Sequence, residues 1–379
     1  MAEVIKSLNL LESLKESIEK NNISDIKDAV EDMLISRINI AVVGERGREK
    51  AAFINSLRGL CVGDGGAALC PSSAAPDELA VFPNPKHPDF RLWDLPAIPS
   101  DPAFDPENYV ERYKVIRYNS VIMTFTEKPS SNMVAFWREA RSLQKDTPYF
   151  ALLASDKDTE KTLDAKKKTS LELLKAEGLS QPKVFLVCPS ALEKLEFLKL
   201  LEVMLGDLPE IRAHALLLAL PTFSSTLVAQ KKDAFQALGW AAASLSAGVS
   251  TIPVPLVSSA VDASIAVRIL TKAQISLCLD DESVDRLARQ RGKDPAKLRE
   301  LRTCLLSVEV CKSEVKRRLS VAEKDNSTST TKLVELAMPR YARSVSRSFT
   351  VMLQAINSAI DDMSADANKI IAVATGASQ

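Results

Sequence analysis

The sequence predicts an α/β protein, in which a doubly wound, mostly parallel sheet is combined with a helical domain. Strand-like apolar runs alternate with helical patterns from residue 38 to about 208. The first strand leads into a glycine-led turn and a helix, which is how a phosphate-binding loop is built. From 210 onward no strand pattern appears. We therefore expect N-terminal helices at 1–36, the α/β domain at 37–208, and a helical domain at 209–379 that packs with the N-terminal helices.

The individual elements follow from short apolar runs bounded by turn residues. Residues 3–34 are expected to be helical, because apolar residues recur there on one helical face. In a doubly wound sheet the ligand loops follow the carboxyl ends of the strands. The strands are expected at Ile38–Val43, Glu78–Phe82, Phe90–Trp93, Ser120–Thr124, Tyr149–Leu152 and Lys183–Val187.

Composition points to a folded cytosolic protein of about two domains, with 379 residues, 46% of them apolar and 26% charged. The net charge of zero provides no overall field for nucleic acid or an anionic membrane. Six scattered cysteines without C-x-x-C spacing, and only two histidines, argue against structural zinc, a disulfide framework and histidine catalysis. The charged, amphipathic N-terminus predicts no signal peptide, and Ala2 does not fit the myristoylation pattern.

The segment 234–261 contains no charged residue and is long enough to span a membrane. It also contains Pro253, Pro255, Gly239 and Gly248, which interrupt a continuous helix. We expect a broken apolar hairpin buried in the helical domain, with membrane insertion as the alternative.

The glycine-led turn departs from a working phosphate-binding loop at two positions. The pattern G-x-x-x-x-G-K-[ST] begins at Gly44, passes through Gly47 and keeps Lys50, but Glu49 replaces the second glycine and Ala51 the hydroxyl residue. In such loops, backbone N–H groups and a helix N-terminus surround the phosphates, and the lysine supplies a positive charge. The frame of a phosphate site is therefore present, while part of its chemistry is missing.

Each replacement has a physical consequence. Two unit charges ~4 Å apart repel by about 1 to 4 kcal/mol at surface-like dielectric, so Glu49 opposes phosphate. Ala51 offers no oxygen to Mg²⁺, which the loop Ser/Thr and a carboxylate normally hold. We expect the rate of nucleotide hydrolysis to be reduced more than the affinity for nucleotide. By itself, the loop is equally compatible with an unrelated α/β fold in which a buried strand simply enters a helix.

Downstream motifs favour the phosphate-binding interpretation. The motifs are GlyAlaAla at 66–68, KHPDF at 86–90, RLWDLPAIP at 91–99, DPENYVERY at 105–113 and DDESVDRLA at 280–288. They occur in order over most of the chain and resemble those of the immunity-related, or interferon-inducible, GTPases. This resemblance implies a Ras-like P-loop G domain, a helical domain formed by both chain ends, GTP or GDP with Mg²⁺ as ligands, and association with membranes.

Within this resemblance, Asp94 matches the aspartate of the family's W-D-L-P-G motif, which orients Mg²⁺ through water. The glycine whose amide meets the γ-phosphate is Ala97 here. Alanine keeps the N–H group but resists the backbone rotation of a switch. The family's threonines near this point align with Ala75–Pro76, and Ser72–Ser73 supply the nearest hydroxyls.

The guanine-reading motif T-K-x-D aligns with Leu153–Asp156, where only Asp156 matches. A register shift would instead use Lys157 and Asp158, but neither alignment restores the motif. Asp156 retains the ability to accept hydrogen bonds from a guanine edge, although the base loses the packing surface of the lysine stem.

The last base-contacting loop resembles Val184–Ser190, so Cys188 and Ser190 are the expected contacts there. Four of the five nucleotide motifs thus depart from the family pattern, and each departure removes a feature that supports nucleotide binding or catalysis. We expect no high-affinity nucleotide cofactor and only a vestigial Mg²⁺ ligand in Asp94.

The sequence therefore favours a quasi-GTPase that acts by binding related GTPases through its G-domain face, in a hetero-oligomer that functions in cell-autonomous defence. We expect a cytoplasmic protein that binds no nucleic acid, with peripheral contact to intracellular membranes left open. One alternative is an atypical, slow GTPase in which Lys50, Asp94 and Asp156 suffice. Another is a membrane-associated adaptor in autophagy or vesicle traffic.

Overall fold

The computed structural model describes residues 23–45, 47–69, 78–99, 102–143, 148–249, 255–326 and 346–376. The chain forms two compact units. Arg37–Pro221 makes up the first, and Met1–Ser36 together with Thr222–Gln379 the second.

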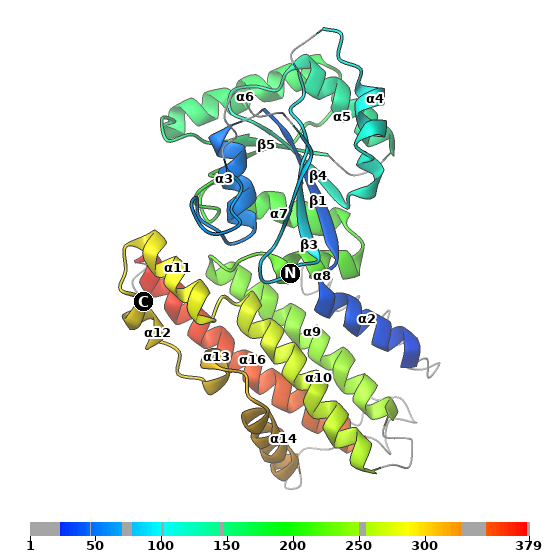
Figure 1. Ribbon diagram of the computed structural model, residues 1–379, viewed down its shortest axis with the longest axis vertical. Coiled ribbons are helices and arrows are strands. Elements are labelled where there is room, and N and C mark those ends of the chain that lie inside the picture. Colours follow the sequence, from blue (N-terminus) through cyan, green and yellow to red (C-terminus); the bar gives the residue numbers. More distant parts are fainter. Residues whose placement is uncertain are drawn as a thin grey trace. The chain divides into compact units, whose positions relative to one another are not determined.

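The first unit is built on a six-stranded sheet with the strand order β2-β3-β1-β4-β5-β6 (Figure 1). β2, at one edge, is antiparallel to β3, and the other neighbouring strands are parallel. The predicted α/β class and its mostly parallel sheet are therefore confirmed. The strands are β1 Ile38–Gly44, β2 Ala80–Pro83, β3 Phe90–Asp94, β4 Ser120–Phe125, β5 Tyr149–Leu153 and β6 Val184–Val187.

Helices cover both faces of this sheet (Figure 1). Alternate residues of β1, Ala41 and Val43, belong to a buried cluster with residues of the helices on one face. On the other face, Phe53 and Phe197 pack edge to face, with ring centroids 6.3 Å apart. Because the central strands are buried on both faces, most of their residues are apolar. The first face carries α4 Pro106–Arg112, α5 Ser131–Leu143 and α6 Glu160–Ala176, and the second α3 Arg48–Leu57 and α7 Phe197–Asp207.

The second boundary of this unit differs from the one expected from the sequence. We placed it after residue 208, but the unit extends to Pro221 because α8, Glu210–Ala219, packs on α7 and β1. The Asn84 side chain also donates a hydrogen bond to the carbonyl of Ala219, at 3.3 Å. The sequence shows that a helix ends before Pro209, whereas the partner of the next apolar helix is decided by packing.

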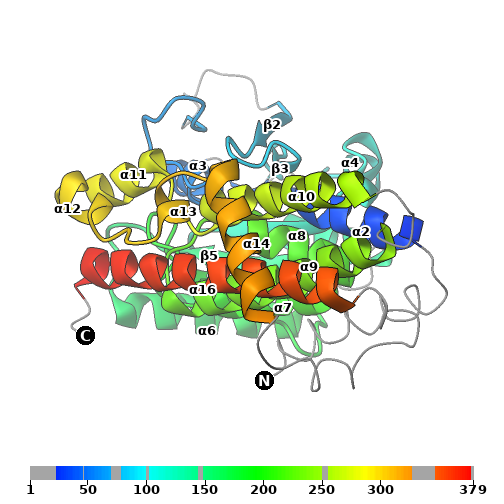
Figure 2. The ribbon, with the colours of Figure 1, turned by 90° about the horizontal axis from the view of Figure 1, so that it is seen from below.

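The second unit is helical throughout its described residues. α9, α10 and α16 pack against one another, and α14 crosses α10 and α16 (Figure 2). α9 also contacts α2, so the N- and C-terminal segments share one helical unit. Its helices are α2 Ile23–Ile35, α9 Ser225–Val249, α10 Pro255–Ser276, α11 Asp281–Arg291, α12 Pro295–Arg299, α13 Leu305–Val308, α14 Lys312–Asn326 and α16 Ser346–Thr375.

The charge-free segment 234–261 falls in α9 and α10, which end and begin on either side of residues 250–254. Gly239 does not interrupt α9. A Cβ atom at this position would lie 2.8 Å from Ile356 of α16, so the glycine allows the two helices to approach closely. No helix among the described residues has both the length and the apolar character needed to cross a membrane.

Two lysines are buried in the helical unit. The fully buried Lys231 donates to the carbonyl of Ser276, and Lys272 donates to the Ser36 hydroxyl, each at 2.7 Å. Burial lowers the pKa of Lys231 to about 8. Burial and the charge of Lys231 together lower the pKa of Lys272 to about 7. The thiol of Cys278 lies in the same region, and burial raises its pKa.

These shifts predict that the helical unit becomes more stable as the pH rises from 7 to 8.5. In that range the unfolded chain holds both lysines protonated, while the folded chain loses protons from them. Each such proton difference adds about 1.4 kcal/mol of unfolding free energy per pH unit. Cys278 has the opposite effect from about pH 8 upward, where the thiol of the unfolded chain begins to ionise first, but this one thiol offsets the two amines only in part.

Urea unfolding followed through Trp240 fluorescence, with Trp93 and Trp137 changed to Phe, measures this slope. Lys272→Met removes one of the two titrating amines and should therefore reduce the slope of unfolding free energy with pH. Stability that stays constant or falls between pH 7 and 8.5 would show that both amines remain charged in the folded unit.

Candidate nucleotide-binding site

The predicted nucleotide-binding residues follow the carboxyl ends of neighbouring parallel strands. Gly44 ends β1 and Asp94 ends β3. Asp156 follows β5, and Cys188 follows β6. Parallel strands place their carboxyl ends at one edge of the sheet, so these positions share an edge although they are far apart in the sequence. They lie at the edge where nucleotides bind in open α/β folds.

Gly44 is required by the close approach of two strands. It pairs with Thr124 of β4 and has a φ angle of 157°. A Cβ atom on Gly44 would lie 2.0 Å from the backbone oxygen of Thr124 and 2.5 Å from its hydroxyl. Because the first of these atoms belongs to the backbone, rotation of a side chain cannot relieve the clash. This glycine therefore shapes the beginning of the loop whether or not a ligand binds.

The loop enters α3 through Gly47, which provides no side-chain cap. Glu49 is the acidic residue of the first turn and is half-buried. Its Oε2 atom lies 3.3 Å from the position that a Cβ on Gly47 would take, so the carboxylate bends back toward the loop. A negative charge at a helix N-terminus is favourable. Glu49 therefore supplies from within the chain the charge that a phosphate would bring.

Lys50 is buried, and its ammonium group is engaged by oxygen atoms of the chain. Its Nζ atom lies 2.9 Å from Asp94 Oδ1. It also donates to the carbonyls of Leu95, at 3.3 Å, and Gly44, at 3.5 Å. To contact a phosphate, this ammonium would have to leave a half-buried carboxylate partner and two carbonyls. Lys50 thus holds the ends of β1 and β3 together.

The same residues do not fit a magnesium site of the usual kind. Ala51 is buried and has no side-chain oxygen, and Asp94 is already in contact with Lys50. The part of the chain that the structure describes contains no group of three His, Cys, Asp or Glu residues able to hold a metal ion. Ser72–Ser73 and Ala75–Pro76, to which the resemblance assigns the closing hydroxyl, lie outside the described residues.

The segment after β3, where a switch would move, is fastened at several points. The amide of Leu95 donates to the carbonyl of Val42, at 3.0 Å. The Tyr109 hydroxyl donates to the carbonyl of Pro96. The Asn132 side chain donates to the carbonyl of Pro99, at 2.6 Å. Leu95 and Ile98 are buried, and Ala97 between them is half-buried. These contacts tie the backbone on both sides of Ala97 to neighbouring elements.

At the base-binding end, the geometry distinguishes the two aspartates. Asp158 is almost fully buried and accepts from the backbone and hydroxyl of Ser155 and from Lys166. Burial alone would raise the pKa of Asp158, but these hydrogen bonds outweigh it and hold the pKa below its ordinary value. Asp158 thus shapes its own loop, while the exposed Asp156 is the carboxylate accessible to a base.

Asp156 already has a partner in this structure. The guanidinium of Arg48, in the first turn of α3, forms an ion pair with its carboxylate. A guanidinium presents neighbouring N–H donors to a carboxylate, which is the pattern that Asp156 would accept from the edge of guanine. Both side chains are largely exposed, so the pair contributes about 0 to 1 kcal/mol. Sequence analysis identified Asp156 but not its contact with Arg48, because 108 positions separate the two residues.

The loop after β6 is held against α3. The Ser56 hydroxyl donates to the carbonyl of Pro189, at 2.6 Å. The side chains of Cys188 and Ser190 hydrogen-bond to each other, with their sulfur and oxygen atoms 3.8 Å apart. The predicted base-contacting loop therefore lies close to the helix that starts at the phosphate loop.

The model of the interferon-inducible GTPase (IIGP) family matches residues 3–372. The chain belongs to the interferon-inducible GTPase family. Among its relatives, rat interferon-inducible GTPase 5 is 28% identical over an alignment that covers 95% of this chain and 81% of the relative. Mouse interferon-gamma-inducible GTPase 10 is 25% identical, with 86% and 80% covered. Mouse interferon-inducible GTPase 1 is 28% identical, with 62% and 59% covered. Family membership identifies the sheet unit as a P-loop GTPase fold.

Proposed function

We propose that this member of the family is a quasi-GTPase with impaired guanine-nucleotide binding and hydrolysis, which regulates related GTPases by binding them. The contact network of Lys50 carries the proposal. A working loop presents its lysine to phosphate, whereas here the ammonium is 2.9 Å from Asp94 and donates to two carbonyls. Glu49 adds a negative charge at the loop. Together, Asp94, the two carbonyls and Glu49 balance the positive charge that the loop would otherwise offer to phosphate.

The base end supports the same proposal. Arg48 occupies the carboxylate of Asp156, so a guanine base would have to displace an internal cation. The loss of the hydroxyl at Ala51 removes a magnesium ligand, which weakens hydrolysis more than binding. A slow GTPase that relies on Lys50, Asp94 and Asp156 is the second candidate, because all three residues are present at the same sheet edge.

The G-domain face is the proposed contact with related GTPases. When the nucleotide faces of such proteins meet, a chain that keeps the fold can occupy one side and cap the assembly. Arg48 is exposed on this face and would lie opposite a partner's phosphates. We place this action in the cytoplasm, in cell-autonomous defence, with recruitment to intracellular membranes through the partner. The adaptor alternative assigns binding to the helical unit instead, around Arg343, which lies outside the described residues.

Charge reversal at Arg48 tests this contact. We expect Arg48→Glu to weaken co-precipitation with a GTP-loaded, catalytically competent family member at least tenfold, because a negative charge would then face phosphate. The natural chain should change the turnover of that partner and show none alone. Lys168→Glu, at an exposed position of α6, is the matched control and should bind normally. Binding that ignores Arg48 but is lost with Arg343→Glu would favour the adaptor, and turnover by the chain alone would favour the slow GTPase.

A further inference from the structure

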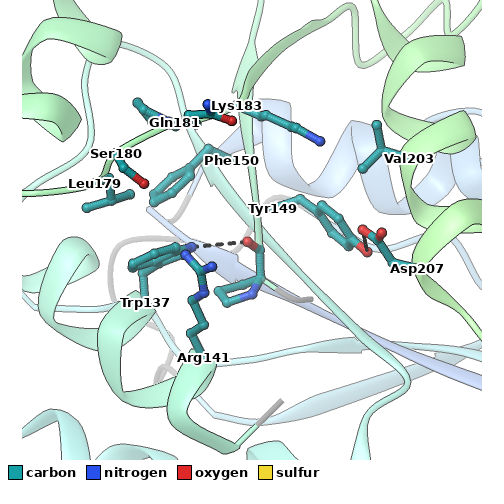
Figure 3. Close-up of a pocket in the computed structure, with 12 residues that line it drawn as sticks. Trp137, Arg141, Tyr149, Phe150, Leu179, Ser180, Gln181, Lys183, Val203 and Asp207 are labelled. Atoms are coloured by element: carbon teal, nitrogen blue, oxygen red, sulfur yellow. Dashed lines mark hydrogen bonds between the residues drawn. The ribbon is translucent and has the colours of Figure 1, made fainter. Parts of the chain in front are cut away.

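A pocket lies at the amino ends of β5 and β6, the edge of the sheet opposite to the nucleotide motifs (Figure 3). Its volume is about 300 Å³. In Figure 3, α5 brings Trp137 and Arg141 to one side of the start of β5. The loop before β6 brings Lys183 to another side, and α7 supplies Asp207. Neither the family's nucleotide motifs nor the proposed G-domain contact uses any of these residues.

The walls of this pocket are held by internal hydrogen bonds. The indole Nε1 of Trp137 donates to the carbonyl of Pro148, at 3.2 Å. The same indole stacks on Phe150, with ring centroids 6.1 Å apart and planes inclined by 27°. On the far side, the Tyr149 hydroxyl donates to Asp207, at 3.0 Å. The aromatic donors are therefore engaged within the wall, and the rings are fixed before any ligand arrives.

The donors that remain are cationic. The guanidinium of Arg141 lies over the Trp137 ring, 4.9 Å from its centroid. Stacking engages the face of a guanidinium and leaves its N–H edges available to an acceptor. Arg141 and Lys183 are both exposed, and within the described part of the chain neither forms an ion pair with a carboxylate. Asp207, the acidic residue of the lining, already accepts from Tyr149.

We propose that this pocket binds an acidic segment of a partner protein. One glutamate or aspartate carboxylate of this segment would accept hydrogen bonds from Arg141, and a second from Lys183. A neighbouring apolar side chain would pack on Trp137 and Leu179, which lie on the same side of the pocket (Figure 3).

The pocket has two cations, Arg141 and Lys183, and one carboxylate, Asp207, which already accepts from Tyr149. The resulting positive charge favours an anionic ligand. Arg141 and Lys183 lie on different sides of the start of β5 (Figure 3), so two carboxylates along one peptide segment would reach both cations, which a single oxyanion would not.

The site acts independently of the proposed function, because it lies at the opposite sheet edge from Gly44 and Asp94. An acidic partner and a related GTPase can therefore bind the same chain at once. This pairing would make the sheet unit a connector between two proteins.

The test uses the full chain and an array of fluorescein-labelled heptapeptides, each with two glutamates beside a central leucine, together with replicas carrying glutamine. Fluorescence anisotropy measures binding to the natural chain, to Arg141→Glu and to Lys183→Glu. Both side chains are exposed, so these variants should keep the natural unfolding midpoint, which circular dichroism checks. Lys161→Glu, at the start of α6, is the control for overall charge.

We expect saturable binding of at least one glutamate peptide, a loss of at least tenfold in each pocket variant, and no loss in Lys161→Glu. The glutamine replica should bind at least tenfold more weakly. Failure of every peptide to bind, equal binding of glutamine replicas, or an equal loss in Lys161→Glu would overturn the proposal. Displacement of the peptide by millimolar phosphate or acetate to the same extent as by unlabelled peptide would reduce the site to an anion pocket and overturn the peptide assignment.

Discussion

The double variant Glu49→Gly with Ala51→Ser is expected to bind GDP with Mg²⁺ at least tenfold more tightly than the natural chain. For the natural chain we expect no saturable binding of GDP or GTP below about 100 μM, well short of a tight complex. The gain comes from removing a carboxylate that bends back toward Gly47 and from adding an oxygen ligand for magnesium. Hydrolysis should not return fully, because Ala97 and the fastened segment around it remain.

Calorimetric titration in magnesium and in EDTA measures this gain, which should be larger in magnesium. Glu45→Gly is the matched control, since Glu45 is an exposed acid of the same loop, and it should change the affinity little. Stoichiometric guanine nucleotide that co-purifies with the natural chain would contradict the proposed function and favour the slow GTPase. Absence of any gain in the double variant would place the defect in the Lys50–Asp94 contact or at the base end.

Gly44→Ala is expected to destabilise the sheet unit by about 3 kcal/mol or more, a large effect for a single methyl group. The new Cβ would lie 2.0 Å from the Thr124 carbonyl oxygen, so β1 and β4 would have to separate where they pair. Overpacking by one methyl group in a deformable core costs about 1 to 3 kcal/mol. A clash with strand backbone lies at or beyond the upper end of that range.

Urea unfolding followed through Trp93 and Trp137 reports on this unit. Gly206→Ala provides the control, because a Cβ on this glycine of α7 meets nothing within 4 Å and alanine favours a helix. That change should be neutral or slightly stabilising. If the two variants unfolded at the same urea concentration, the close approach of β1 and β4 at Gly44 would be wrong.

Local patterns were sufficient to predict most of the sheet. The run Ile38–Val43 is apolar except at Asn39, because most of β1 is buried on both faces, and its predicted bounds differ from the observed strand by one residue. The edge strand β2 has a weaker sequence signal, since it has only four residues and these alternate between half-buried and exposed positions. The antiparallel direction of β2 depends on its pairing with β3, which has no local signal.

The sequence by itself determined the class of fold, the order of the strands along the chain, and which residue types are missing from the nucleotide motifs. These properties depend on local periodicity and on the identities of Glu49 and Ala51. Only the tertiary structure decided that Lys50 contacts Asp94, that Arg48 meets Asp156 while Asp158 is used within its own loop, and that α8 joins the sheet unit. Each of these is a contact between residues distant in sequence. Sequence periodicity predicts the face of a helix or strand on which a residue lies. The packing of several elements decides which charged group contacts it there.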